Sequence, residues 1–229
     1  MKSAKLLSVL LFLLSLHSSA QEKITIKNEL QFSSKPLVLH TNYSEFAKDT
    51  LSFETVKFYI SNIQILYKNG AITKEKNSFH LLDFENTESL QFELEKSTEK
   101  IQAISFSIGI DSLTNVSGAL GGDLDATKGM YWAWQSGYIN LKIEGKSSSC
   151  NTRKNKFQFH IGGYLKPFYA MKTVVLPINN NITNNTLTLK YDISKLFSNI
   201  NLKEFNTVMI PNEKAVQFSD AFQKIISVE

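Results

Sequence analysis

The sequence predicts a mainly β protein, an antiparallel two-sheet β-sandwich with a short C-terminal helix. Three observations lead to this prediction: several stretches alternate apolar and polar residues, turn-forming residues separate them, and apolar residues recur at helical spacing only near residue 220. Of the 229 residues, 42% are hydrophobic and 20% are charged. The chain therefore has enough apolar side chains for a sizeable core, and too many for a disordered protein.

Five stretches alternate with a period of two, which places one face of each predicted strand on the core. The residues expected to face inward are Val56, Phe58 and Ile60; Ile104, Phe106, Ile108 and Ile110; Ile139, Leu141 and Ile143; Phe157, Phe159 and Ile161; and Leu187, Leu189 and Tyr191. Turn residues such as Asn69-Gly70 and Gly121-Gly122 separate these strands. No internal repeat or shift in composition marks a second domain, so residues 21–229 are expected to form one β-sandwich domain.

Helical spacing is clear near the C-terminus. The apolar residues that recur there every three or four positions are Ala215, Phe218, Ala221, Phe222 and Ile225. This pattern is typical of an amphipathic helix that packs on the sandwich. One shorter helical turn is predicted for residues 192–197, with Asp192 or Ser194 as its cap.

The first 20 residues have the pattern of a secretory signal peptide. Lys2 and Lys5 precede an apolar run over residues 6–16, and a polar, small-residue stretch then leads to a cleavage point before Gln21. The run is too short to cross a bilayer, and no run of spanning length follows it. We therefore expect a periplasmic or secreted protein without stable membrane insertion.

Charge and cysteine content exclude a nucleic-acid-binding protein and a protein held by an internal disulfide. The net charge is +4, and the lysines are scattered among acidic residues, so no nucleic-acid-binding face is expected. Cys150 is the single cysteine, which allows no intramolecular disulfide. An exported domain of this kind is held by its core, or by a core and a metal. Cys150 follows three serines and is interpreted as a free thiol at a loop tip.

The most unusual stretch is residues 118–138, where a Gly- and Asp-rich loop precedes both tryptophans of the chain. If this stretch ends in a strand, Trp132 and Trp134 face the same side, with Met130 in line with them. Core filling is the ordinary role of such aromatic residues. Loops on a rigid scaffold are, however, where binding sites are usually carried. Both interpretations stay open.

His80 and His160 lie 80 residues apart, so no local ligand spacing supports a metal site. From the residues alone, each is better explained as a structural histidine, and a shared site requires the fold to bring two strands together. Asp111, Asp123 and Asp125 allow a calcium-type oxygen cage, although side-chain caps in an Asp-rich turn explain them better. No Ser-His-Asp order, P-loop or paired-carboxylate signature is present, so no enzymatic activity is predicted.

Several strings, taken in order, resemble the MbnP family over about residues 24–190. They include Phe58-Tyr59-Ile60-Ser61-Asn62, His80-Leu81-Leu82-Asp83, Gly122-Asp123-Leu124-Asp125, Gly129-Met130-Tyr131-Trp132-Ala133-Trp134 and Phe159-His160-Ile161-Gly162-Gly163. The resemblance implies an exported β-sandwich that binds copper. It implies Cu(I) held by two histidines and by a kynurenine made from a tryptophan. It also implies a di-haem, peroxidase-like partner enzyme of the MauG/MbnH type that performs the oxidation.

Carried onto this chain, the resemblance assigns His80 and His160 as the imidazole ligands. It assigns Trp132 or Trp134 as the oxidised tryptophan, with a slight preference for Trp134, and Met130 as a soft neighbour. Cu(I) is soft and accepts few ligands, so two neutral imidazoles and one weak ligand suffice. The alternative is a metal-free module that binds another periplasmic or cell-surface protein. Convergence of the two imidazoles and an indole on one pocket would separate these hypotheses.

Overall fold

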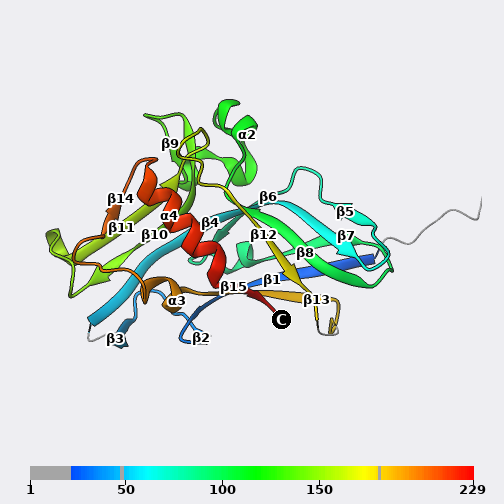
Figure 1. Ribbon diagram of the computed structural model, residues 1–229, viewed down its shortest axis with the longest axis horizontal. Helices are drawn as coiled ribbons and strands as arrows, with labels where there is room; N and C mark the ends of the chain where they lie inside the picture. The colour runs from blue at the N-terminus through cyan, green and yellow to red at the C-terminus, as the bar shows by residue number, and fades with distance from the viewer. Residues whose placement is uncertain (1–21, 47–48, 180–181) are drawn as a thin grey trace, which may run out of the picture.

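The structure is a computed structural model that describes residues 22–46, 49–179 and 182–229 (Figure 1). The predicted signal peptide, residues 1–20, lies outside the described residues. Within the described ranges, no helix is long and apolar enough to span a lipid bilayer.

Strands dominate the structure and form two sheets. The smaller sheet contains β1 (Glu22–Phe32), β2 (Lys35–Pro36), β7 (Gln91–Lys96), β13 (Thr186–Asp192) and β15 (Ile226–Val228). The larger sheet contains β3 (Asn42–Phe46), β4 (Asp49–Tyr67), β5 (Ile72–Lys74), β6 (Phe79–Asp83), β8 (Ile101–Ile108), β9 (Tyr131–Trp132), β10 (Gly137–Ser147), β11 (Lys156–Gly162), β12 (Lys172–Pro177) and β14 (Thr207–Val208). The predicted β-sandwich is confirmed.

The smaller sheet has the order β15-β13-β1-β2, with β7 also paired to β1. The larger sheet has the order β12-β8-β4-β10-β11-β14, with β3, β5 and β6 paired to β4 and β9 paired to β10. Most pairs are antiparallel, as predicted, whereas β1–β13 and β11–β14 are parallel.

The long strand β4 organises the larger sheet. On one edge, β10 pairs with residues 51–58 of β4 and β8 pairs with residues 60–67, while β3, β6 and β5 occupy the opposite edge. At the junction of β8 and β10, the Asn140 side chain fills the space that a Cβ on Gly109 would need. Gly109 also has a φ of +107°, and Asn140 Oδ1 accepts a hydrogen bond from Ile110 N at 3.0 Å. Only glycine suits this position.

The main core lies between the two sheets. Its aromatic centre joins both sheets to the C-terminal helix, because the Phe58 ring lies 4.7 Å from that of Tyr191 and 5.2 Å from that of Phe222. The inward residues predicted for the five strands are buried, as expected. Two of them, Ile110 and Ile139, face the other side of the larger sheet, since Gly109 and a bulge between Ile139 and Leu141 shift the alternation.

The predicted C-terminal helix is confirmed as α4 (Glu213–Phe222). Asn212 caps it by accepting a hydrogen bond from Ala215 N at 2.8 Å, and its Phe218 ring packs 4.7 Å from that of Phe159. The short turn at residues 192–197 is α3 (Ile193–Phe197), with Asp192 as its cap. Three single turns of 3-10 helix lie elsewhere on the sandwich: η1 (Thr87–Leu90), η4 (Arg153–Asn155) and η5 (Gln223–Ile225).

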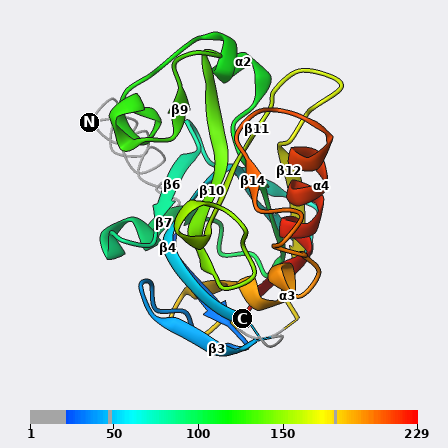
Figure 2. The same cartoon turned by 90° about the vertical axis from the view of Figure 1, so that its left-hand side faces the viewer.

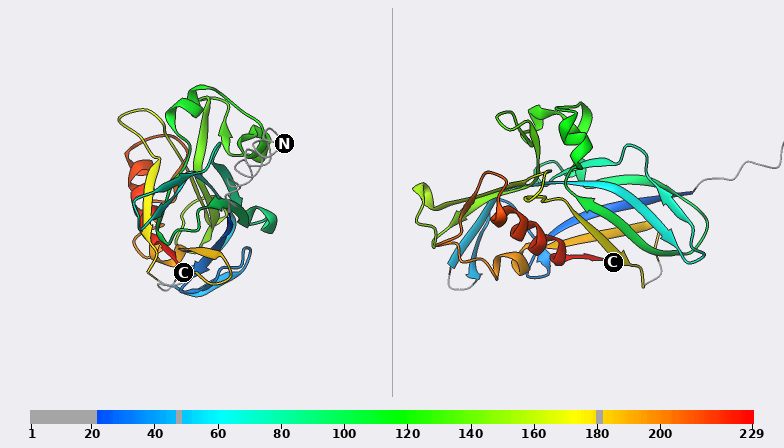
Figure 3. Two further views of the ribbon diagram at one scale, coloured as in Figure 1. Left: turned by 90° about the vertical axis from the view of Figure 1, so that its right-hand side faces the viewer. Right: turned by 45° about the horizontal axis from the view of Figure 1, so that its top comes forward.

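A lobe built from residues 109–138 covers the outer face of the larger sheet. It contains α2 (Ser112–Val116), η2 (Gly122–Leu124), η3 (Ala126–Lys128) and β9. Figures 1 and 3 show α2 and β9 rising together away from the sandwich. Under the lobe lies a second apolar cluster formed by Tyr59, Leu81, Ile110, Leu124, Met130, Trp132, Tyr138 and Ile139.

Cys150 is a free cysteine next to a turn, as predicted, but the sequence did not indicate its burial. It lies in the turn after β10, but its side chain is buried and its Sγ is 3.6 Å from Leu202 O. Burial raises the pKa of the thiol. Cys150 is therefore a core residue, because the turn points its side chain inward.

Gly145→Ala tests how tightly β10 packs between its neighbours. A Cβ at this position would overlap the backbone oxygen of Ser52 and lie 2.5 Å from Phe157 Cζ. Since a backbone oxygen cannot swing aside, we expect the free energy of unfolding to fall by about 3 kcal/mol, measured by urea denaturation. Gly121→Ala is the control, because a Cβ there meets nothing within 4 Å. Equal stability of the two variants would contradict this packing.

Candidate metal site

The pairing register places the two predicted histidine ligands on opposite faces of the larger sheet. His160 on β11 pairs with Lys142 on β10, Lys142 pairs with Lys57 on β4, and Lys57 pairs with Asp83 on β6. Cross-strand partners point to the same face, so Asp83 and His160 share a face. His80 precedes Asp83 by three residues in the same strand and therefore points to the other face.

The shared pocket expected for His80 and His160 is thus not formed in this fold. The physical reason is the two-residue period of a strand, which separates residues at an odd offset onto opposite faces. Within the described part of the chain, no three His, Cys, Asp or Glu side chains gather in a way that could hold a metal ion. The individual roles of the two histidines as ligands stay predictions.

His160 lies on the outer face of the larger sheet, which is the face that the lobe covers. Its side chain is buried, and its Nε2 is 2.6 Å from Glu144 Oε1 on β10. The hydrogen bond from His160 lowers the pKa of Glu144 to about 2, so Glu144 is ionised at neutral pH. An ionised carboxylate only accepts hydrogen bonds, so Nε2 carries a proton and donates the hydrogen bond. In the neutral ring, Nδ1 is then the nitrogen that has a lone pair for a metal ion. A carboxylate that orients an imidazole in this way is typical of metal-binding histidines.

Trp132 and Met130 lie on the same side of the sheet as His160. The Trp132 ring covers Gly162, two residues after His160, where a Cβ would lie 2.6 Å from the indole. Met130 is fully buried in the outer cluster beside Trp132. The structure therefore places one imidazole, one indole and one thioether on this face.

Trp134 does not continue the strand as expected. β9 ends at Trp132, and a turn over residues 133–136 follows, with Gln135 N donating to Trp132 O at 3.3 Å. Trp132 is 6% exposed, whereas Trp134 is 64% exposed. The two rings still touch, with their centroids 5.7 Å apart. Trp134 departs from the expected alternation because the turn begins one residue after Trp132.

His80 lies between the sheets and not under the lobe. Its ring stacks on Phe92 of β7 in the smaller sheet, with centroids 3.7 Å apart and planes 10° from parallel. Its Nε2 lies 2.9 and 3.0 Å from the two carboxylate oxygens of Glu75. These contacts suit a structural histidine that ties the sheets together.

The three aspartates considered for a calcium cage each hold a separate backbone position. Asp111 accepts from Thr114 N at 2.9 Å, and Asp125 accepts from Thr127 N at 2.8 Å. Asp123 accepts from Leu81 N at 3.1 Å and pairs with Lys128 at 2.6 Å. This arrangement agrees with the interpretation of these residues as caps and turn anchors.

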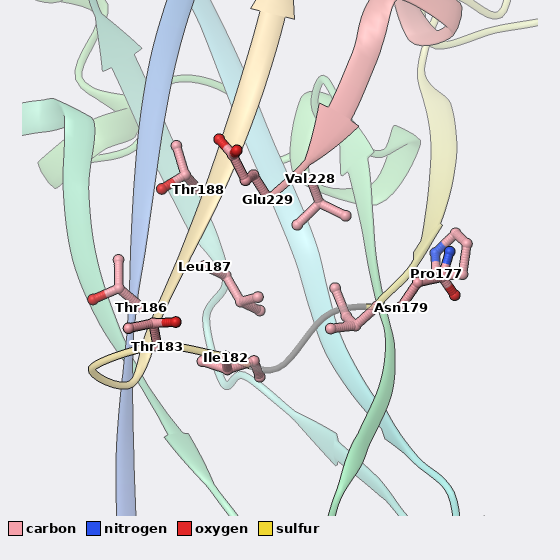
Figure 4. Close-up of a pocket in the computed structure, with 10 residues that line it drawn as sticks. Pro177, Asn179, Ile182, Thr183, Thr186, Leu187, Thr188, Val228 and Glu229 are labelled. Atoms are coloured by element: carbon pink, nitrogen blue, oxygen red, sulfur yellow. The ribbon is translucent and has the colours of Figure 1, made fainter.

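Two of the cavities in the structure show where metal-binding side chains are, and are not, available. One, of about 450 Å³, is lined by His80, Asp83 and Asp123 among other residues. Asp83 is already paired to Lys57, and Asp123 to Lys128. The other, of about 510 Å³, lies where β15 ends beside β13, and Figure 4 shows Ile182, Leu187 and Val228 around it. The described residues that line this second cavity include no histidine, cysteine or methionine, so it offers copper no soft or imidazole ligand.

Glu144 and Glu75 are the site residues that sequence reasoning missed. Glu144 occupies an outward position of a predicted strand, but its proximity to His160 follows only from the pairing of β10 with β11. Glu75 lies five residues before His80, in the connection between β5 and β6. Nothing in the spacing of either glutamate indicates the contact.

Comparisons with known proteins agree with this fold. A family model, MbnP, matches residues 21–210. Among solved structures, MbnP from Methylosinus trichosporium is similar, with a TM-score of 0.65 and 14% sequence identity over 91% of this chain and 98% of that chain. At this identity the likeness shows the fold alone. Among curated proteins, none matches this chain.

Glu144→Gln tests the hydrogen bond to His160 through its pH dependence. The pKa of Glu144 is lowered from 4.5 to about 2 in the folded state. Its carboxylate therefore stabilises the fold above about pH 4.5, and this contribution is lost as the pH falls towards 2. We expect the difference in unfolding free energy between the native protein and this variant to shrink over that range in urea titrations. Glu99→Gln, at an exposed position, serves as the control. If the difference in unfolding free energy between the native protein and Glu144→Gln does not change with pH, the hydrogen bond between Glu144 and His160 is contradicted.

Single tryptophan variants test the two indole environments. Trp132→Phe leaves only the exposed indole, and Trp134→Phe leaves only the buried one. Acrylamide reaches exposed rings by collision, so we expect strong fluorescence quenching in Trp132→Phe and weak quenching in Trp134→Phe. Similar quenching constants would show that both rings are equally accessible.

Proposed function

Because the chain belongs to the MbnP family, we propose that it is an exported copper-binding protein of the periplasm or cell exterior and not an enzyme. Copper is the metal that the resemblance to this family implies. The observation that carries the proposal is the buried His160, oriented by the ionised Glu144 and placed on the same face as Trp132.

The donor atoms on this face suit copper in kind. A neutral imidazole nitrogen and a thioether are ligands that copper accepts, and the soft Cu(I) ion tolerates few of them. The proposed site has one imidazole of this chain, His160, and Met130, on the same side of the sheet, as a soft neighbour. The residues do not fit a single site made of His80 and His160, since those side chains lie on opposite faces.

The proposal includes oxidation of a tryptophan to kynurenine by a di-haem partner enzyme. Dioxygen or peroxide is the oxidant that opens the indole ring, and water then releases the indole C2 as formate. Trp134 is the indole that a second protein can contact, because it is 64% exposed. Trp132 is the indole whose product would lie nearest to His160, because its ring covers Gly162. Peptide mapping of the mature protein by mass spectrometry distinguishes the two positions.

A metal-free interaction module is the second candidate function. One observation favours it: the buried His160 and the half-buried His80 both already contact carboxylates through Nε2, at 2.6 Å and 2.9 Å respectively. Such contacts satisfy a structural histidine without any metal.

Two substitutions separate these candidates. We expect His160→Ala to weaken Cu(I) binding at least about tenfold, since it removes a ligand, while His80→Ala leaves the affinity close to that of the native protein. Anaerobic competition with bicinchoninate measures the affinity, and circular dichroism checks that both variants fold. Equal affinities in all three proteins would favour the metal-free module, and equal losses in both variants would restore a two-histidine site.

The protein purified from its native host tests the function directly. We expect bound copper in elemental analysis and a mass change at one tryptophan peptide. Absence of both copper and tryptophan oxidation would count against the proposal, whatever the recombinant variants show.

A further inference from the structure

A pocket opens on the outer face of the larger sheet, beyond the part that the lobe covers. The lobe contacts β6 and β10, and Figure 2 shows α2 and β9 together at one end of the molecule. The pocket lies instead over β4, β8 and β12 and has a volume of about 400 Å³. It is named here the bulge pocket, and its lining includes Asn62, Gln64, Lys74, Ser105, Ser107 and Thr173. Its volume suits a small molecule.

A β-bulge in β4 forms one wall of the bulge pocket. Where β4 pairs with β8, two residues of β4, Asn62 and Ile63, lie opposite the single Phe106 of β8. Asn62 has a φ of +53°, in the left-handed region. Bulges are frequent beside functional sites because they re-aim side chains, and residues in unusual backbone conformations gather at the same places.

Hydrogen bonds to the backbone fix the bulge in this shape. Asn62 N donates to Ser78 O at 3.2 Å, and Ile63 N donates to Ser78 Oγ at 2.9 Å. Ile63 O accepts a hydrogen bond from Glu75 N at 3.0 Å. The residues before β6 therefore occupy the polar groups that the bulge removes from the ladder, and the wall of the pocket is preformed.

The polar side chains of the bulge pocket are not used inside the protein. Those of Asn62, Gln64 and Ser105 form no hydrogen bond with another described residue, although Gln64 and Ser105 are half-buried. The hydroxyl groups of Ser107 and Thr173 contact only each other among the described residues, at 3.4 Å, which is long for a hydrogen bond. Hydroxyl and amide groups both donate and accept, so the pocket offers a ligand several hydrogen bonds of either sense.

Charge and side-chain type narrow the class of ligand. Among the described residues that line the pocket, Lys74 is the single basic one, whereas phosphate groups favour arginine and clustered cations. The same lining has no aromatic ring on which a nucleobase could stack. A sugar ring carries hydroxyl groups that donate and accept, and its C–H groups suit the apolar atoms of Ile63 and Met171, which also line the pocket.

We propose that the bulge pocket binds a saccharide, with one sugar ring hydrogen-bonded to Asn62, Gln64 and Ser105. The inference goes beyond the proposed copper function and does not depend on it, because the pocket shares no residue with the face that carries His160 and Trp132.

Saturation-transfer NMR on the purified protein tests the class of ligand. The probes are the methyl pyranosides of glucose, galactose, mannose and N-acetylglucosamine, with mannitol as an acyclic polyol. We expect saturation transfer to at least one pyranoside and none to mannitol, since only a ring holds its hydroxyl groups in fixed directions. Failure of every pyranoside, or equal transfer to mannitol, would overturn the proposal.

Three substitutions place the binding in the pocket. Gln64→Ala and Ser105→Ala each remove a hydrogen-bonding group, so we expect each to raise the Kd of the bound pyranoside about fivefold in NMR titrations. Gln102→Ala is the matched control, because Gln102 is exposed on β8 and does not line the pocket. Circular dichroism checks that all three variants fold. An unchanged Kd in both pocket variants, or an equal rise in Gln102→Ala, would contradict the site.

An oligosaccharide of the bound sugar distinguishes the two sources of such a ring. A higher affinity for the oligosaccharide than for the methyl glycoside identifies a polysaccharide as the ligand, and equal affinities identify a free sugar; both results support the site. The Gln64→Ala and Ser105→Ala variants should keep the native Cu(I) affinity, so that failure of saccharide binding and failure of copper binding are told apart.

Discussion

The pairing of β4 with two successive partners on one edge is the constraint on which the rest of the structure depends. β10 and β8 meet end to end there, and the junction requires Gly109 at a positive φ, with the Asn140 side chain filling the vacant Cβ position. The same junction interrupts the alternation, so that Ile110 and Ile139 turn to the outer face. An apolar patch on that face has to be covered, and the 109–138 excursion covers it. The lobe thus exists because of a local break in strand pairing.

The lobe determines the chemistry that is available on the outer face. By burying Trp132 over Gly162 and enclosing Met130, it brings an indole and a thioether to the side of the sheet that carries His160. The ionised Glu144 accepts a hydrogen bond from Nε2 of that imidazole, which leaves Nδ1 as the ring nitrogen able to bind a metal. On the other face, His80 stacks on Phe92 and joins the two sheets. The two histidines therefore differ in role, although they are of one residue type and both contact a glutamate.

The two sides of the small lobe differ in burial and polarity. Its underside is buried, and its upper side is apolar and nearly uncharged, with Trp134 between them in contact with Trp132. The hydrogen bonds of Ser112 and Asn115 keep the lobe rigid without strands of its own beyond β9. In this member of the MbnP family, the lobe thus covers the side of the larger sheet that carries His160, Trp132 and Met130.

The sequence by itself determined the fold class, the five alternating strands, the C-terminal helix and the short turn at residues 192–197, because these depend on residues within a few positions of one another. It also determined that the aspartates at 111 and 125 act as caps, which is again a local interaction. Only the tertiary structure decided the faces of His80 and His160, the separation of Trp132 from Trp134, and the burial of Cys150. The physical reason is that alternation relates residues within one strand, whereas the relative face of two strands depends on register, bulges and turns set by distant partners.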